Sequence, residues 1–157
     1  MSDLLAAVPI PRRTMVLFFL VDTSGSMSGD KIGAVNEAIR EVIPEIKDIS
    51  NENADALIKI AVLEFSSGSN WLYEKPIESD QFVWNNLEAG GLTDMGVAFK
   101  MLNEKLSRTQ FMADAIGSYA PAIFMMSDGA PTDDYKKELE VLRKNKWFKV
   151  AIKVAVA

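Results

Sequence analysis

The sequence predicts an α/β fold with a doubly wound, mainly parallel sheet, helices on both faces and one antiparallel hairpin strand. Apolar runs of strand length alternate along the chain with segments whose apolar residues recur at helical spacing. The run at 15–21 contains no polar residue, which is typical of a central strand buried on both faces. The predicted order, β-α-β-β-α-β-α-β, fits helices packed on both faces of one sheet.

The first half of the chain contributes a central strand, a long helix and a second strand. The strand at 15–21 is followed by a segment at 30–49 with apolar residues at helical spacing. Asp30 is available as the N-cap of this helix, and Pro44 is expected to kink or split it. A polar loop then leads to the second strand, predicted over 57–65.

A hairpin and an irregular segment follow the second strand. Residues 66–70 are rich in turn formers, so the short apolar piece at 71–73 is predicted to pair with the second strand as its hairpin partner. Residues 76–92 are predicted to be irregular, with one helical turn near 82–84. This segment ends at the pair of glycines at 90–91, which favours a break in regular structure.

The second half of the chain repeats the alternation of helix and strand, with a poorly specified connector at 108–120. Its predicted elements are a helix with a core stripe from Met95 to Leu106, a strand over 122–126, a helix capped by Asp133 or Asp134 that ends near Asn145, and a last strand over 148–156.

One domain is expected from 157 residues with 48% hydrophobic and 25% charged side chains. We assign residues 1–13 to an N-terminal extension and residues 14–157 to the domain. The last predicted strand ends on its own apolar residues, with no turn or covering helix after it. We therefore expect the domain to be C-terminally incomplete, its last helix and strand missing; the alternative is an edge strand that ends the chain.

Composition excludes several classes of function. The chain has no cysteine and no histidine, which removes thiolate nucleophiles, disulfides, Cys/His zinc sites and Ser-His-Asp triads. A net charge of −5 argues against nucleic acid as a partner. The longest apolar run is far shorter than the ~20 residues of a membrane helix, and the N-terminus lacks the pattern of a signal peptide. We expect a cytoplasmic protein with no membrane partner.

Three polar segments are expected to meet at the edge of the sheet where ligands bind in open α/β folds. Asp22, Ser24 and Ser26 alternate after the first strand, Thr93 stands at the start of a helix, and Asp128 follows another strand. Each could instead serve a local turn, since such roles are common for these residue types. Together, two carboxylates and three hydroxyls predict a site for a small, hard divalent cation.

Competing motifs fail on spacing. A phosphate-binding loop would need a Ser or Thr after Lys31, where the chain has Ile32, and its glycine spacing is also wrong. A calcium loop that starts at Asp22 would need Gly and Glu where Met27 and Gly33 stand. A Gly-x-Gly-x-x-Gly dinucleotide motif is absent from the sequence.

The pattern Asp22-x-Ser24-x-Ser26, then Thr93, then Asp128 resembles the metal-ion-dependent adhesion site of von Willebrand factor type A domains. The resemblance covers residues 14–157. Finer features resemble the bacterial tellurium-resistance, TerY-like group of these domains; they are the segments at 90–96, 126–134 and 145–148.

The resemblance implies how each residue would act. Ser24 and Ser26 would bind Mg²⁺ or Mn²⁺ directly, with Ca²⁺ ranked lower, and Thr93 would bind directly or through water. Asp22 and Asp128 would act largely through water. The open coordination position would take a Glu or Asp carboxylate from a partner protein. Domains of this family are usually binding modules and not enzymes. The resemblance to the TerY-like group implies a role in a bacterial stress or tellurium-resistance system.

Several alternatives remain open at this point. The same cation could serve a metal-assisted hydrolase or phosphatase, or the site could be vestigial in a structural scaffold. The uncovered last strand could pair with another copy of the chain to form a homodimer. Family members continue past this strand, so a switch between open and closed states stays in doubt. The aromatic residues Trp71, Tyr73 and Trp84 could mark a partner face or pack over the sheet edges.

Overall fold

A computed structural model describes residues 12–113, 117–129 and 131–156. Most of the predicted extension at 1–13, part of the connector at 108–120 and Ala130 of the segment 126–134 lie outside these residues. The strands are β1 (Arg13–Asp22), β2 (Ala56–Ser66), β3 (Gly68–Trp71), β4 (Ile77–Glu78), β5 (Ala122–Met126) and β6 (Ile152–Val156). The helices are α2 (Asp30–Glu52), α3 (Met95–Lys105), α4 (Lys136–Arg143) and α5 (Lys146–Val150), with 3-10 turns η1 (Gly25–Met27) and η2 (Ser79–Gln81).

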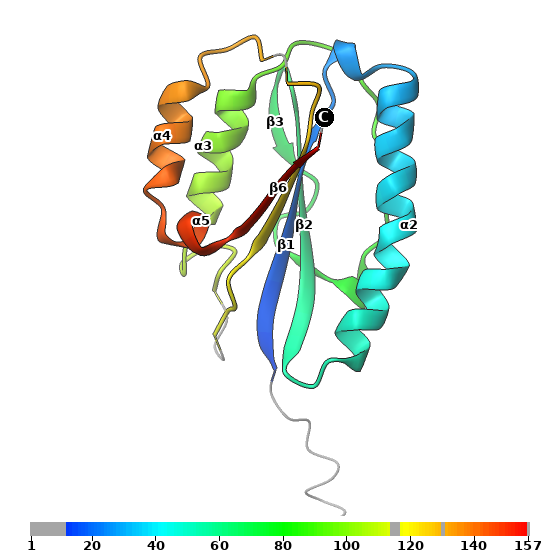
Figure 1. Ribbon diagram of the computed structural model, residues 1–157, viewed down its shortest axis with the longest axis vertical. Coiled ribbons are helices and arrows are strands. Elements are labelled where there is room, and N and C mark those ends of the chain that lie inside the picture. The colour runs from blue at the N-terminus through cyan, green and yellow to red at the C-terminus, as the bar shows by residue number, and fades with distance from the viewer. Residues whose placement is uncertain (1–11, 114–116, 130, 157) are drawn as a thin grey trace, which may run out of the picture.

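The strands form one sheet in the order β3-β2-β1-β5-β6, and β4 also pairs with β2. The pairs β1 with β2, β1 with β5 and β5 with β6 are parallel, whereas β3 and β4 run antiparallel to β2. Helix α2 covers one face, and α3, α4 and α5 lie over the other (Figure 1). The predicted α/β class, with its mainly parallel sheet and helices on both faces, is confirmed.

The central strand β1 is buried on both faces, as its continuous apolar run predicts. Phe18 points into the core cluster that includes residues of α3 and α4, whereas its neighbour Phe19 points into the cluster formed with α2. This alternation follows from the pleat of a strand, in which successive side chains point to opposite faces. The strand therefore ends at a fixed place between two helical layers, where its last residue, Asp22, is fully buried.

Helix α2 is one continuous helix of 23 residues, so the predicted split at Pro44 is wrong. Pro44 is exposed and leaves the carbonyl of Arg40, also exposed, without its helical donor. Because that carbonyl lies on the solvent side of the helix, water can satisfy it. The predicted N-cap is also wrong: Gly29, with φ of +79°, precedes the helix and Asp30 is its first residue.

The hairpin partner of β2 lies slightly earlier than predicted. It runs from Gly68 to Trp71, because Gly68 pairs with Ser66 and closes the turn at once. The helical turn also lies earlier, at Ser79–Gln81. The aromatic residues of this region pack inward: Trp71 against Phe18, and Tyr73 and Trp84 against Phe82.

The predicted last strand over 148–156 is wrong in its first half. Residues Lys146–Val150 form α5 because the side chain of Asn145 accepts hydrogen bonds from the backbone N–H of Trp147 at 2.9 Å and of Phe148 at 3.3 Å. This N-cap satisfies donors that would otherwise have no partner, and it outweighs the strand preference of the aromatic residues. The Asn145 side chain also donates to the carbonyl of Leu106, which fixes α5 beside the end of α3.

The predicted cap of the preceding helix is wrong as well. Tyr135 is the N-cap of α4, and the Asp133 carboxylate instead accepts a hydrogen bond from the backbone N–H of Gly96 in the first turn of α3. Asp133 therefore caps a neighbouring helix. Within the described part of the chain, no helix is long and apolar enough to cross a membrane.

Candidate functional site

The candidate site begins where β1 ends, at the buried carboxylate of Asp22. One of its oxygens, Oδ1, accepts a hydrogen bond from the backbone N–H of Ser24 at 2.9 Å. The other, Oδ2, accepts one from the hydroxyl of Ser127 at 2.7 Å. Ser127 directly follows β5, so Asp22 joins the ends of two neighbouring parallel strands. The carboxylate thereby links the loop after β1, which we call the first loop, to the loop after β5, which we call the third loop.

Two serine hydroxyls lie together in the loop after Asp22. The Oγ atoms of Ser24 and Ser26 are 3.1 Å apart. The 3-10 turn η1 brings them together. Its last residue, Met27, is buried in the core and fixes the turn there. Ser24 is buried, whereas Ser26 is exposed. The pair therefore places one buried and one exposed serine side by side, with their hydroxyls within hydrogen-bond distance.

The loop at 90–93 packs directly on the first loop. The backbone N–H of Gly90 donates to the carbonyl of Thr23 at 2.8 Å, and that of Gly25 donates to the carbonyl of Gly91 at 2.9 Å. Gly91 has φ of +88°, and a Cβ there would lie 2.7 Å from the hydroxyl oxygen of Ser67. A side chain at this position would be strained and would press on Ser67 in the turn between β2 and β3.

Thr93 is buried and is held by the third loop. Its backbone N–H donates to the hydroxyl of Thr132 at 2.9 Å, and the Thr132 N–H donates back to the Thr93 carbonyl at 2.9 Å. Together with the bond from Gly96 to Asp133, this pairing joins the segment after Asp128 to the start of α3. All three predicted loops therefore meet at one end of the sheet.

Asp128 lies at the rim of this site, beside the first turns of α2. Its carboxylate is 3.7 Å from the ammonium group of Lys31, with 12% of the Asp128 side chain and 58% of the Lys31 side chain exposed. Gly129 follows with φ of +78° and donates its N–H to the Ser127 hydroxyl. The rim thus carries one partly exposed carboxylate and one exposed cation.

The oxygen atoms of this site are of the kind that a small divalent cation binds, and they come from hydroxyls more than from carboxylates. Within the described ranges, no three acidic side chains gather to hold a metal. The Ser24 and Ser26 oxygens, however, have nearly the separation of about 3.0 Å that adjacent ligands of an octahedral Mg²⁺ require. Because both Asp22 oxygens already accept protein hydrogen bonds, that carboxylate suits a role in the outer shell, through bound water.

Three residues that contact the five predicted site residues were not among those predicted from the sequence. Ser127, Thr132 and Lys31 contact, respectively, Asp22, the backbone of Thr93, and Asp128. Ser127 could have been found from its place directly after a buried strand. Thr132 and Lys31 carried no signal, since each meets its partner across different loops.

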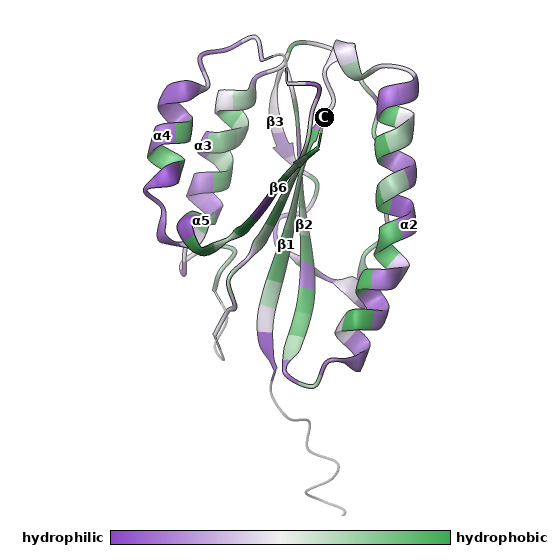
Figure 2. Cartoon of the chain, viewed as in Figure 1, coloured by the Kyte–Doolittle hydropathy of each residue, from purple (hydrophilic) through white to green (hydrophobic). Residues whose placement is uncertain are grey.

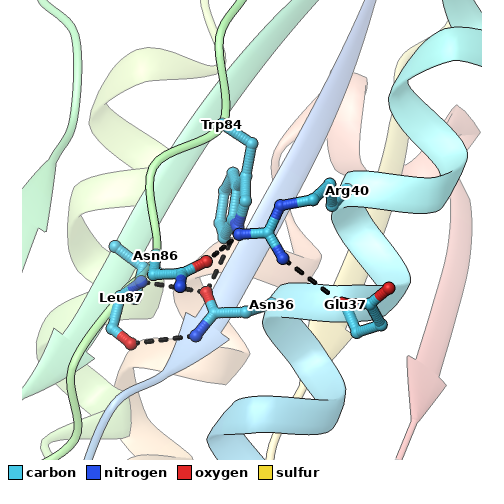
Figure 3. A network of polar contacts seen from close by, with 6 residues as sticks. All are labelled: Asn36, Glu37, Arg40, Trp84, Asn86 and Leu87. Carbon is cyan, nitrogen blue, oxygen red and sulfur yellow. Dashed lines mark hydrogen bonds and ion pairs between the residues drawn. The ribbon is translucent and has the colours of Figure 1, made fainter.

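A polar network on α2 holds the segment that leads to the loop at 90–93 (Figure 3). The side chain of Asn36, which is 6% exposed, donates to the Leu87 carbonyl at 3.0 Å and accepts from the Leu87 N–H at 2.9 Å and from Trp84 Nε1 at 3.2 Å. On the exposed side, Arg40 contacts both Glu37 and Asn86. One buried amide therefore holds the irregular segment against the helix shortly before Gly90.

Comparison with protein-family models gives a match over most of the chain. The family model "von Willebrand factor type A domain" matches residues 17–130. A search of curated proteins found no match.

Solved structures resemble the fold at low sequence identity. The ArnB paralog VWA2 from Sulfolobus acidocaldarius is 19% identical, with a TM-score of 0.63 over 93% of this chain and 35% of that one. A von Willebrand factor type A protein from Catenulispora acidiphila is 16% identical, with a TM-score of 0.65 over 91% and 33%. The pilus adhesin SpaC from Lactobacillus rhamnosus GG is 18% identical, with a TM-score of 0.59 over 78% and 16%. This chain thus spans about a third or less of the length of these structures.

Proposed function

Because this chain belongs to the von Willebrand factor type A domain family, we propose that it is a protein-binding module that uses a Mg²⁺ or Mn²⁺ ion to capture an acidic side chain of a partner. Domains of this family generally mediate protein interactions, often through a metal site. The single observation that supports this site best is the pair of hydroxyls on Ser24 and Ser26, 3.1 Å apart at the end of the central strand.

In this proposal the hydroxyls of Ser24, Ser26 and Thr93 bind the cation, and the carboxylates of Asp22 and Asp128 act mainly through bound water. Neutral oxygens leave most of the charge of the ion uncompensated, so the ion attracts an anionic ligand to its open position. A Glu or Asp carboxylate of the partner is the ligand that proteins supply most readily. The module then binds without chemical turnover, and we propose no enzymatic activity.

The wider setting is also a proposal. The segments at 90–96 and 126–134 support membership of the TerY-like group, and hence a role in a bacterial stress or tellurium-resistance system. The metal-dependent interaction would then assemble proteins of that system.

The test is a thermal-unfolding titration with Mg²⁺, Mn²⁺ and Ca²⁺. A ligand that binds the native state stabilises it by about 2.7 kcal/mol at a concentration 100 times its Kd, so the melting temperature of the wild type should rise with Mg²⁺. The double variant Ser24→Ala with Ser26→Ala should lose this rise. Ser28→Ala removes an exposed serine just outside the pair and should retain it.

Two results would contradict the proposal. One is a melting temperature of the wild type that does not rise with Mg²⁺ or Mn²⁺ up to about 10 mM, since an ion that binds the native state must stabilise it. The other is a rise that persists unchanged in the double variant.

A further inference from the structure

The start of α3 is capped by an aspartate from a distant segment. Asp94 occupies the N-cap position of this helix, yet its side chain makes no capping hydrogen bond. Its Oδ2 accepts instead from the backbone N–H of Gly68 at 2.7 Å, in the turn between β2 and β3. The backbone N–H of Gly96, in the first turn of α3, donates to Oδ2 of Asp133 at 2.8 Å. A residue of the third loop thus does what an N-cap aspartate ordinarily does.

This arrangement leaves one oxygen of Asp133 without a partner. Its Oδ1 atom is buried and has no hydrogen bond among the described residues. A buried acceptor without a partner lowers stability, and the loss is larger when the oxygen belongs to a carboxylate. The stability of α3 alone therefore does not explain why Asp133, and not Asp94, caps this helix.

The exchange of caps fixes the position of Thr93, which is 3% exposed. The third loop is held at two successive residues: Thr132 pairs with Thr93 through two hydrogen bonds of 2.9 Å, and Asp133 follows with its bond to α3. On the other side, the carbonyl of Gly91 accepts from the N–H of Gly25, which lies between the two serines of the first loop. Thr93 is therefore held between the first loop and the third.

The third loop lies so close to α3 that the contact requires a glycine. A Cβ on Gly96 would lie 2.9 Å from Oδ2 of Asp133, 3.2 Å from the Cα of Tyr135 and 3.3 Å from the carbonyl oxygen of Asp134. Two of these three atoms belong to the backbone, so they cannot turn away as a side chain can. The separation of α3 from the third loop is thus closely defined.

We infer that Asp133 is a positioning residue for the candidate metal site, and that its cap on α3 sets the preference of the site for Mg²⁺ over Ca²⁺. The inference rests on the proposed function, in which the Thr93 hydroxyl is one of the ligands. Mg²⁺ requires oxygens at about 2.0–2.1 Å in nearly ideal octahedral geometry, whereas Ca²⁺ accepts about 2.3–2.6 Å and a more flexible set. A threonine held from both sides suits the smaller ion, and one that is free to shift suits the larger ion as well.

The experiment measures the Kd of Mg²⁺ and the Kd of Ca²⁺ by calorimetric titration of the whole chain and of three variants. Asp133→Ala removes the cap. Asp133→Asn removes the same charge but keeps an oxygen that can accept from the Gly96 N–H. Asp134→Ala removes a charge from the neighbouring residue, which is exposed. The last two variants therefore separate the effect of the cap from the effect of charge.

Asp133→Ala should weaken Mg²⁺ binding about tenfold, as is typical when a residue that orients a metal ligand is lost. Ca²⁺ binding should weaken only about twofold, because the larger ion adapts to a displaced hydroxyl. The ratio of the two Kd values should therefore change about fivefold. Asp133→Asn and Asp134→Ala should keep this ratio within about twofold of the wild-type value, since Asn is as good a cap as Asp and Asp134 is not the cap.

A further variant gives the answer if Asp133→Ala is too unstable to titrate. Gly96→Ala leaves every aspartate in place but presses on the third loop, so it should lower the preference for Mg²⁺ in the same direction. Urea denaturation of each variant measures stability separately. A purely structural role of Asp133 would lower stability and leave the ratio of the Kd values unchanged, because both ions bind the same folded protein.

The outcomes distinguish this inference from the proposal on which it rests. If the wild type binds neither ion, the proposed function is wrong and the inference fails with it. If the wild type binds Mg²⁺ no more tightly than Ca²⁺, or if Asp133→Ala keeps the wild-type ratio, the inference alone is overturned. An equal change of the ratio in Asp133→Asn or Asp134→Ala would also overturn it, since charge and not the cap would then set the preference.

Discussion

The two faces of the sheet differ in how completely they are covered. On one face, α3, α4 and α5 pack over a core in which Phe18 contacts the rings of Trp71 and Phe111, with centroids 6.1 Å and 6.2 Å away. On the other face, α2 covers β1 and β2, while Val154 and Val156 of β6 stay exposed. The edge strand β6 is exposed along its whole length, and its larger apolar side chains, Ile152, Val154 and Val156, lie on the α2 face. Figure 2 shows β6 as hydrophobic over most of its length.

This difference bears on stability. A closed aromatic core gains free energy from burial and dispersion contacts, and it tolerates little change in volume. The partly covered face gives up some of that gain along β6. The two faces should therefore respond differently when a buried side chain is truncated.

The largest expected effect tests this comparison at two neighbouring residues. Phe18→Ala should lower the free energy of unfolding by about 4 kcal/mol, because it leaves a cavity in the closed core. Phe19→Ala should cost about 3 kcal/mol, since Phe19 stacks on the partly exposed Phe124, which can move into the space. Urea denaturation of both variants measures the difference.

The comparison would be wrong if Phe19→Ala proved as costly as Phe18→Ala or more so. Equal slopes of free energy against urea concentration in the two variants are the control, because they show that both unfold from equally compact native states.

A smaller effect is expected on the α2 face, from the polar network around the buried Asn36 side chain. Asn36→Ala removes the acceptor of the Leu87 N–H and of Trp84 Nε1, and both partly buried donors lose that partner. We expect a loss of about 2 kcal/mol in the free energy of unfolding. Amide exchange should also accelerate over residues 84–87 before it does so in β1, since the segment loses its anchor.

Asn86→Ala is the matched control for this prediction. Asn86 is exposed and contacts the exposed Arg40, so its loss should change stability by less than about 0.5 kcal/mol. Similar costs for the two asparagines would show that the network on α2 is not what holds the segment.

The sequence predicted the elements whose signals are local and strong. The apolar run of β1, the helical spacing of α2 and α3, and the turn before β3 each follow from side chains within one segment. The five candidate site residues were predicted in the same way, because each stands in a segment that follows a strand or precedes a helix. Their approach to one end of the sheet then follows from the parallel topology.

The errors arose where a distant partner decided the local structure. Asn145 starts α5 in a segment that its composition assigns to a strand, and it is fixed there by the end of α3. Asp133 caps α3 instead of its own helix because the loop folds back onto Gly96. The pairing of Thr132 with Thr93 likewise joins residues 39 positions apart. Spacing within one segment carries no information on such contacts.

The smallest expected effect concerns the ion pair of Lys31 and Asp128 at the rim of the site. Lys31→Ala removes a cation 3.7 Å from the Asp128 carboxylate and should change the free energy of unfolding by less than about 0.5 kcal/mol, since the lysine is mostly exposed. Mg²⁺ should nevertheless bind roughly threefold more tightly at low ionic strength, because a positive charge no longer competes for that carboxylate. Calorimetric titration at low and high salt measures both the gain and its loss by screening. Lys47→Ala, at the far end of α2, should leave the affinity unchanged; an equal gain there would mean that net charge, and not the rim, sets the affinity for the ion.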